Sequence, residues 1–158
     1  MTEQTMNPIV VAVDGSEPGW DAMHTALYLA GLIGRPVDVL HVIRIRKAGY
    51  FAFIDRHLHE EFETLAQKVL HDAKQRAQEA GVEVRTHLLE GEKDPSEAIV
   101  NYLEQAGPVK FLVLGTFGHG YIGRHILGST TERVIREVAH RGLPVPVLVV
   151  PATNLVTI

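Results

Sequence analysis

The chain has 158 residues, which is the usual length of one domain and enough to bury a core without disulfides or metals. It contains no cysteine, which excludes disulfides, thiolate catalysis and cysteine-ligated zinc. The net charge of −4 argues against nucleic-acid binding, no apolar run is long enough to span a membrane, and the polar segment 1–7 does not resemble a signal peptide. We therefore expect a single domain, residues 1–158, in the cytoplasm.

The first part of the chain is predicted to form two buried strands with a helix between them. The continuous apolar run Ile9–Val13 predicts the first strand, and residues 14–19 predict a turn. Apolar residues at three- and four-residue spacing then predict a helix over 18–33 that ends at Gly34. Val37–Val42 predicts the second strand.

A long loop is predicted to follow the second strand. The segment Ile43–Asp55 mixes basic residues with Tyr50, Phe51 and Phe53 and shows no clean period. Loops of this length inside compact domains are often functional. Two interpretations stay open, namely a functional loop or a hydrophobic flap packed on the core.

The middle of the chain predicts a long helix, a third strand and another helix. One apolar face over residues 57–80 predicts the long helix. Val82–Leu88 alternates between apolar and polar residues, which predicts a half-exposed strand near an edge of the sheet. Asp94, followed by proline at the first helical position and glutamate at the third, predicts the start of a helix that reaches Ala106.

The last part of the chain predicts a strand, a glycine-rich loop, a helix and a final strand. Phe111–Leu114 is the fourth strand, and the next helix is predicted to open at Ser129, with Glu132 at the capping-box spacing. The last strand, Val147–Val150, is framed by prolines. Strands that alternate with helices in this way predict an α/β fold with a single open parallel sheet and helices on both faces.

The glycine-rich loop is the strongest candidate for a binding site. Its glycines are Gly115, Gly118, Gly120, Gly123 and Gly128. Glycines let backbone N–H groups approach an anion, and the following helix N-terminus offers unpaired N–H groups and partial positive charge. The loop could therefore cradle phosphate groups, although a plain glycine-rich turn is the alternative.

Two familiar phosphate motifs do not explain this loop. Gly118–Gly123 matches G-x-G-x-x-G, but it does not directly follow the strand, no helix starts there, and no acidic residue lies about twenty positions later. The chain also contains no Gly-Lys-Ser or Gly-Lys-Thr, which the P-loop requires.

A different spacing fits the loop. Gly115, Gly118 and Gly128-Ser129 form the pattern G-x2-G-x9-G-[S/T]. On this pattern the sequence resembles the nucleotide-binding branch of the universal stress protein family. The resemblance extends to three strand segments and covers most of the chain: Ile9–Ser16, Val39–Val42 and Pro146–Val150.

The resemblance implies a Rossmann-like sheet of order 3-2-1-4-5 and a set of nucleotide-binding residues. Asp14 would lie near the adenine or ribose, and Ala12, Val13 and Val42 would line the adenine. The phosphate loop and helix start would comprise Gly115, Gly118, Gly128, Ser129 and Thr130. Beside the resemblance, the loop residues Thr116, His119 and Gly120 are further candidates, and a cationic His119 between its glycines could meet a phosphate. Three of these have simpler alternatives: Asp14 as a turn residue that caps its own backbone, Ser129 as a helix cap, and His119 as a solvent-exposed loop residue.

The resemblance also implies a function. We expect an ATP-binding regulatory module that acts on an unknown partner such as a transporter or an enzyme, with Mg²⁺ or Mn²⁺ accompanying the ATP phosphates. We expect a homodimer formed through the last strand, or a tetramer, and neither nucleic-acid binding nor a membrane span. The alternatives are a slow ATPase or a nucleotidyl- or phosphotransferase, and, with less support, a nucleotide-free scaffold or a flavin carrier.

Overall fold

A computed structural model describes residues 7–44, 52–91, 94–116 and 127–152, with the backbone alone for residues 52–59 and 62. Strands and helices alternate along the chain, as the sequence predicted. The elements are β1 (Ile9–Ala12), α1 (Glu17–Ile33), β2 (Val37–Arg44), α2 (Ala52–Ala80), β3 (Val84–Gly91), α3 (Pro95–Ala106), β4 (Phe111–Gly115), α4 (Ser129–His140) and β5 (Val147–Val150).

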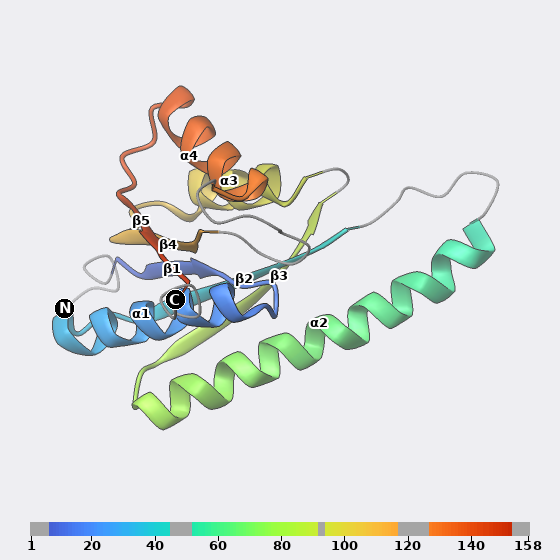
Figure 1. The fold of residues 1–158 in the computed structure, drawn as a ribbon, viewed down its shortest axis with the longest axis horizontal. Helices are drawn as coiled ribbons and strands as arrows, with labels where there is room; N and C mark the ends of the chain where they lie inside the picture. The colour runs from blue at the N-terminus through green and yellow to red at the C-terminus, as the bar shows by residue number, and fades with distance from the viewer. Residues whose placement is uncertain (1–6, 45–51, 92–93, 117–126, 153–158) are drawn as a thin grey trace, which may run out of the picture.

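The five strands form one parallel sheet in the order β3-β2-β1-β4-β5. This confirms both the predicted fold class and the predicted strand order. Helices α1 and α2 cover one face of the sheet, and α3 and α4 cover the other (Figure 1).

The central strand β1 supplies residues to both cores. Val11 belongs to the cluster that contains Met23 of α1 and Ala73 of α2. Val10 points to the other face and belongs to the cluster that contains Val100 of α3 and Val134 of α4. Because both faces of β1 are covered, its sequence is a continuous apolar run rather than an alternating one.

The edge strands are β3 and β5. The side chains of β3 are half-buried or exposed along its whole length, as its alternating sequence predicted. β5 pairs with β4 alone among the described strands, and its Leu148 is 38% exposed. The free side of β5 is therefore able to accept another strand.

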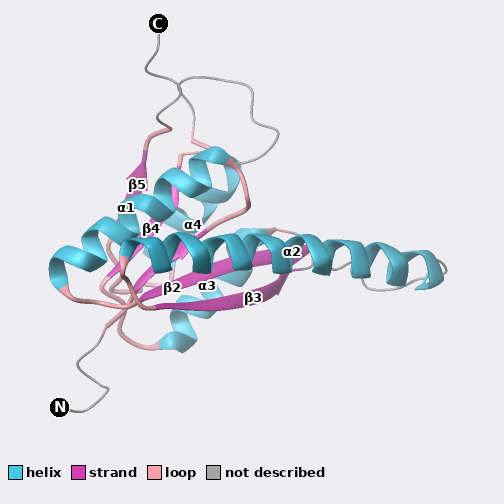
Figure 2. Cartoon of the chain, turned by 90° about the horizontal axis from the view of Figure 1, so that it is seen from below, coloured by secondary structure: helices cyan, strands magenta, loops and turns pink. Residues whose placement is uncertain are grey.

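Helix α2, with 29 residues, is the longest helix described. Its C-terminal half packs on the sheet through residues at three- and four-residue spacing, namely Ala66, Leu70, Ala73 and Ala77. Its N-terminal end extends beyond β2 and β3 (Figures 1 and 2). Among the helices in the described ranges, α2 included, none is long and apolar enough to cross a membrane.

The predicted bounds of the loop Ile43–Asp55 are wrong at both ends. β2 continues to Arg44 because its last two residues pair with the last two residues of β3. α2 begins at Ala52 rather than at residue 57, since extending an existing helix costs little even where the sequence has no periodic signal. Residues 45–51 lie outside the described residues, so both interpretations of this loop stay predictions.

The predicted capping box at Ser129 is also wrong. The N-cap of α4 is Gly128, no side chain of the described residues caps this helix, and Ser129 is its first helical residue. Glu132 instead binds Arg136 within the same helix at 2.6 Å. The predicted cap at Asp94 is confirmed, because its carboxylate accepts a hydrogen bond from the Ser96 N–H at 2.8 Å.

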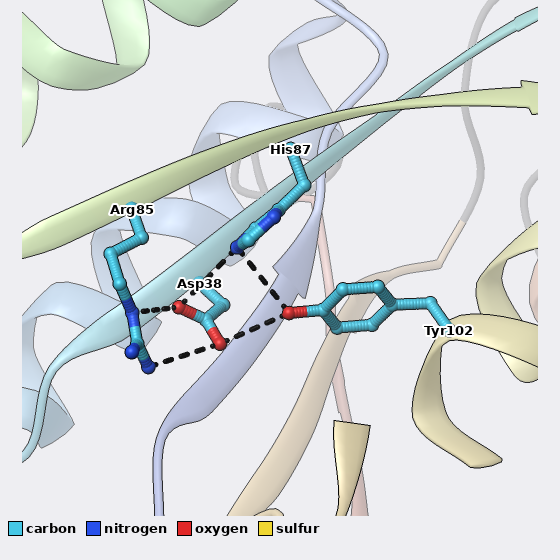
Figure 3. A network of polar contacts seen from close by, with 4 residues as sticks. All are labelled: Asp38, Arg85, His87 and Tyr102. Atoms are coloured by element: carbon cyan, nitrogen blue, oxygen red, sulfur yellow. Dashed lines mark hydrogen bonds and ion pairs between the residues drawn. The ribbon is translucent and has the colours of Figure 1, made fainter. Parts of the chain in front are cut away.

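A buried polar network joins β2, β3 and α3 at the edge of the sheet where the strands begin (Figure 3). Asp38 is 4% exposed, and its carboxylate accepts hydrogen bonds from the Nε and Nη2 atoms of Arg85 at 2.7 and 3.3 Å. The hydroxyl of Tyr102 donates to the same carboxylate at 3.1 Å, and the Nε2 atom of His87 lies 3.3 Å from that hydroxyl. Hydrogen bonds from Arg85 and Tyr102 thus compensate the buried charge of Asp38. Because Tyr102 belongs to α3, the network fixes α3 on the sheet.

The network makes the stability of the protein sensitive to alkaline pH. Burial and the neighbouring Asp38 carboxylate raise the pKa of Tyr102 to about 12 from its ordinary value of 10.0. The raised pKa means that folding favours the protonated hydroxyl of Tyr102. This contribution to stability is fully present below pH 10 and is lost as the pH rises to about 12. We therefore expect the free energy of unfolding, measured by urea denaturation, to decline between these pH values. Tyr102→Phe should show a smaller decline, and an unchanged decline would contradict the assignment.

Gly31 lies in the interior of α1, and none of the described residues packs against it so closely that a glycine is needed. A Cβ atom at Gly31 would meet no atom of the described part of the chain within 4 Å. Because glycine weakens a helix interior, we expect Gly31→Ala to raise the free energy of unfolding by about 0.5–1 kcal/mol. The matched control is Gly34→Ala at the end of the same helix, where φ is +68° and alanine should destabilise the protein. Urea denaturation of both variants tests the expectation, which fails if Gly31→Ala gives no gain.

Candidate functional site

The topology places the ends of β1 and β4 side by side. Strand order reverses between them, since the chain runs from β1 to β2 and β3 on one side and later to β4 and β5 on the other. Val11 of β1 lies opposite Val113 of β4, so the residues that follow both strands share one edge of the sheet. Ligands of open parallel sheets bind at such a switch point. We call this region, formed by residues 12–16, 115–116 and 128–131, the switch-point edge.

Asp14 is part of a tight turn between β1 and α1. Its carboxylate accepts hydrogen bonds from the N–H of Ser16 at 2.9 Å and from the Ser16 hydroxyl. Ser16 in turn caps α1 by accepting from the Gly19 N–H, and Gly15 adopts a φ of 86° that few other residues tolerate. The turn-capping alternative for Asp14 is therefore present in the structure, and the side chain is at the same time exposed at the switch-point edge.

His41 fixes the end of β1, a role that the sequence reasoning missed. The Nδ1 atom of His41 lies 2.8 Å from the carbonyl oxygen of Val13. A carbonyl oxygen only accepts, so Nδ1 donates this hydrogen bond. The bond holds Val13 at the point where the pairing of β1 with β2 ends. A polar residue near the end of an apolar strand is the signal that could have identified His41.

Two of the predicted adenine-lining residues, Ala12 and Val42, face the same side of the sheet. Both pack against the core cluster formed by α3 and α4, and both are partly exposed. Val13 is buried and belongs to the other cluster, so its backbone rather than its side chain is accessible to contribute at this edge.

Gly115 has a packing reason for being glycine. A Cβ atom at this position would lie 2.8 Å from the carbonyl oxygen of Pro18 and 3.0 Å from its carbonyl carbon. β4 therefore approaches the first turn of α1 so closely that only a hydrogen fits between them. This close approach holds the turn of Asp14 next to the end of β4.

The end of β4 and the start of α4 are joined by hydrogen bonds. The N–H of Gly128 donates to the carbonyl oxygen of Thr116 at 2.6 Å, and the Thr131 hydroxyl donates to the carbonyl oxygen of Gly115 at 2.8 Å. Among the described residues, the hydroxyl oxygen of Thr116 is buried without a hydrogen-bond partner. An unsatisfied buried hydroxyl is costly, so this group is suited to bind a polar atom of a ligand.

The N-terminus of α4 has Gly128 as its N-cap, so its N–H groups have no capping side chain among the residues that the structure describes. Ser129 is exposed and Thr130 is partly exposed at this end. The first N–H groups of a helix have no partner within the helix, and they carry partial positive charge. The arrangement is therefore able to bind an anion. Three predicted site residues, Gly118, His119 and Gly120, lie outside the described residues, and their roles stay predictions.

An ion pair braces the start of α4 against the start of α3. Arg133 of α4 binds the carboxylate of Asp94, which is the N-cap of α3. Burial opposes the ionisation of Asp94, but the hydrogen bonds from Ser96 and the contact with Arg133 outweigh it and lower its pKa below the ordinary value. Asp94 is therefore ionised at neutral pH, and the pair orients the first turns of α4.

Comparisons with known proteins agree with this architecture. The model of the universal stress protein family matches residues 6–151. Universal stress protein MJ0531 of Methanocaldococcus jannaschii is 32% identical over 94% of this chain and 84% of the relative. The structure of the universal stress protein UspA from Lactobacillus plantarum covers 91% of this chain and 97% of its own, with 26% identity and a TM-score of 0.76.

A further structure shares the fold at lower identity. The universal stress protein from Archaeoglobus fulgidus, solved in complex with dAMP, covers 90% of this chain and 96% of its own. Its identity is 24% and its TM-score is 0.61. At this identity the similarity establishes the shared fold.

Proposed function

This chain belongs to the universal stress protein family, and we propose that it binds ATP at the switch-point edge and acts as a nucleotide-dependent regulatory module on a partner protein. The proposal rests on the glycine pattern of the sequence and on the groups that meet at this edge. The dAMP bound to the Archaeoglobus protein supports it, since that protein has the same fold. The absence of cysteine suits the cytoplasmic location that we propose with it.

The buried hydroxyl of Thr116 is the observation that carries the proposal. A buried polar atom without a hydrogen bond destabilises a folded protein, and a ligand that supplies the hydrogen bond removes this cost. The Thr116 hydroxyl lies at the carboxyl end of β4, and the backbone of Thr116 is bonded to Gly128 at the start of α4. A phosphate held at the helix N-terminus would therefore lie within the same small region as this hydroxyl.

The residues at the switch-point edge fit the base, ribose and phosphates of ATP. The exposed N-terminal turn of α4, with Ser129 and Thr130, would hold the phosphates. Asp14 would reach the ribose or adenine, and Ala12, Val13 and Val42 would line the base. We propose that Mg²⁺ or Mn²⁺ enters with the phosphates, because Mg²⁺ is usually bound by phosphate oxygens, water and few side chains.

We further propose that the protein is a homodimer formed through β5. The support is the free side of this strand and the exposure of Leu148, which would otherwise leave an unprotected edge. Two such dimers would give the tetramer that remains an alternative. Sedimentation of the purified chain measures the assembly, and a monomer would contradict the proposal.

Native mass spectrometry of the freshly purified protein, followed by titration with ATP and magnesium, tests the proposed function. We expect a mass increase of one nucleotide for each chain. Slow appearance of ADP in the same sample would instead favour the ATPase alternative. No bound nucleotide and no titration would overturn the proposal and leave the glycine-rich loop as a structural turn.

A further inference from the structure

The C-terminal halves of α1 and α2 lie together on one face of the sheet (Figure 1). An open groove lies between them. Its volume is about 950 Å³. One wall is a stripe of α1 that includes Tyr28, Gly31 and Leu32, and the other is a stripe of α2 that includes Asp72 and Glu79. We call this feature the α1–α2 groove. It lies away from the switch-point edge, which is at the N-terminal end of α1.

The α1 wall of the groove is apolar and exposed. Tyr28 is 67% exposed and Leu32 is 64% exposed, although residues of these types gain free energy when they are buried. Gly31 lies between them, and none of the described residues requires it to lack a side chain. Glycine weakens the helix at this position, but it keeps the wall flat. A close approach of another backbone at Gly31 would explain why a glycine is present.

The α2 wall offers negative charge. Asp72 and Glu79 line the groove two helical turns apart, and among the described residues neither side chain takes part in an ion pair or hydrogen bond. The cation between them is already engaged. The guanidinium of Arg76 lies 4.3 Å from the centre of the Trp20 ring, and its Nη1 atom lies 2.8 Å from the Nε2 atom of His24. Arg76 keeps its positive charge, but its guanidinium is engaged by Trp20 and His24, so a ligand of this wall meets two carboxylates that have no ion pair or hydrogen bond among the described residues.

We propose that the α1–α2 groove binds an amphipathic helix of a partner protein, with an apolar stripe next to a basic stripe. The apolar stripe would cover Tyr28 and Leu32 and approach closest at Gly31. Two basic side chains about two turns apart would pair with Asp72 and Glu79, which are separated by about 10 Å. The α1 helix of a second copy would not provide this basic stripe, because α1 contains no lysine or arginine that could face these carboxylates.

The inference does not depend on nucleotide binding, and its test uses no nucleotide. The probe is a fluorescent, end-blocked peptide of leucine and lysine, about 14 residues long, with leucines at helical spacing. Fluorescence anisotropy measures its affinity for the full chain. We expect binding that weakens with salt, and no binding of the twin peptide in which glutamate replaces lysine.

Groove variants locate the binding on the surface. Gly31→Leu should fill the groove and lower the affinity at least about tenfold, and Gly31→Ala should lower it by a smaller factor. The double variant Asp72→Asn with Glu79→Gln should also lower it at least about tenfold. The control with the same charge change is Glu60→Gln with Glu63→Gln, two exposed positions on α2 outside the groove, which should leave the affinity within about twofold. Circular dichroism confirms that each variant is folded, and Gly31→Ala keeps the test valid if the leucine variant is not.

Several results would overturn the proposal. One is a lack of binding of the leucine–lysine peptide to the unaltered chain. Another is an equal loss of affinity in the control variant, because it would show general attraction to an acidic protein. Binding of the glutamate twin with similar affinity would remove the role of Asp72 and Glu79. Self-association of the chain that disappears in Gly31→Leu would show that the occupant is a second copy.

Discussion

Gly115→Ala is expected to lower the free energy of unfolding by about 2–3 kcal/mol, because a methyl group has no space at this position. The added Cβ atom would lie 2.8 Å from the carbonyl oxygen of Pro18, which is backbone and cannot rotate away. Either β4 or the first turn of α1 must shift. Thermal or urea denaturation measures the loss, and for a chain of this size each 1 kcal/mol lowers the melting temperature by about 2–4 °C.

The matched comparison is Gly31→Ala, the same chemical change at a position with open space. The two variants should move stability in opposite directions, so a general effect of replacing glycine cannot explain both. ATP affinity should also fall in Gly115→Ala, because a shift of either β4 or the first turn of α1 would move the Asp14 turn relative to the end of β4. An alanine variant with unchanged stability and lost ATP binding would contradict the packing role and make Gly115 a residue of the phosphate loop alone.

Gly115 shows where the sequence was informative and where it was not. The spacing of Gly115, Gly118 and Gly128 was sufficient to indicate the family and, through it, the strand order that the sheet has. The spacing could not reveal that Pro18, almost a hundred positions earlier, lies against Gly115. Contacts between distant segments depend on the sheet order and register, and a local pattern contains no information about either.

The other differences between prediction and structure have the same origin. β2 extends to Arg44 because β3 pairs with it there, and the local sequence around Arg44 does not indicate this pairing. Asp38 stands within an apolar run, and the sequence gives no sign that Arg85 and Tyr102 converge on it. At Ser129 the local pattern was misleading about the cap alone, since α4 begins at Ser129 as predicted but Gly128 is its N-cap and Glu132 binds Arg136 instead.

The second large effect is expected for Ser129→Asp, which should separate helix stability from nucleotide binding. Ser129 is exposed in the first turn of α4, where a negative charge stabilises the helix by about 0.3–1 kcal/mol. If the phosphates of ATP occupy the same helix terminus, the aspartate repels them. We expect the ATP affinity to fall roughly 10- to 100-fold, and each factor of ten corresponds to about 1.4 kcal/mol.

Two controls make the result specific to the phosphate position. Ser129→Asn has nearly the same shape as the aspartate variant without its charge, so it should lose much less ATP affinity. Adenosine has no phosphate, so its affinity should be the same for the unaltered chain and for Ser129→Asp. Isothermal titration calorimetry measures both ligands, and urea denaturation should show that Ser129→Asp is at least as stable as the unaltered chain. An unchanged ATP affinity in this stable variant would mean that the phosphates lie elsewhere, because an added negative charge at their binding site could not leave the affinity unaffected.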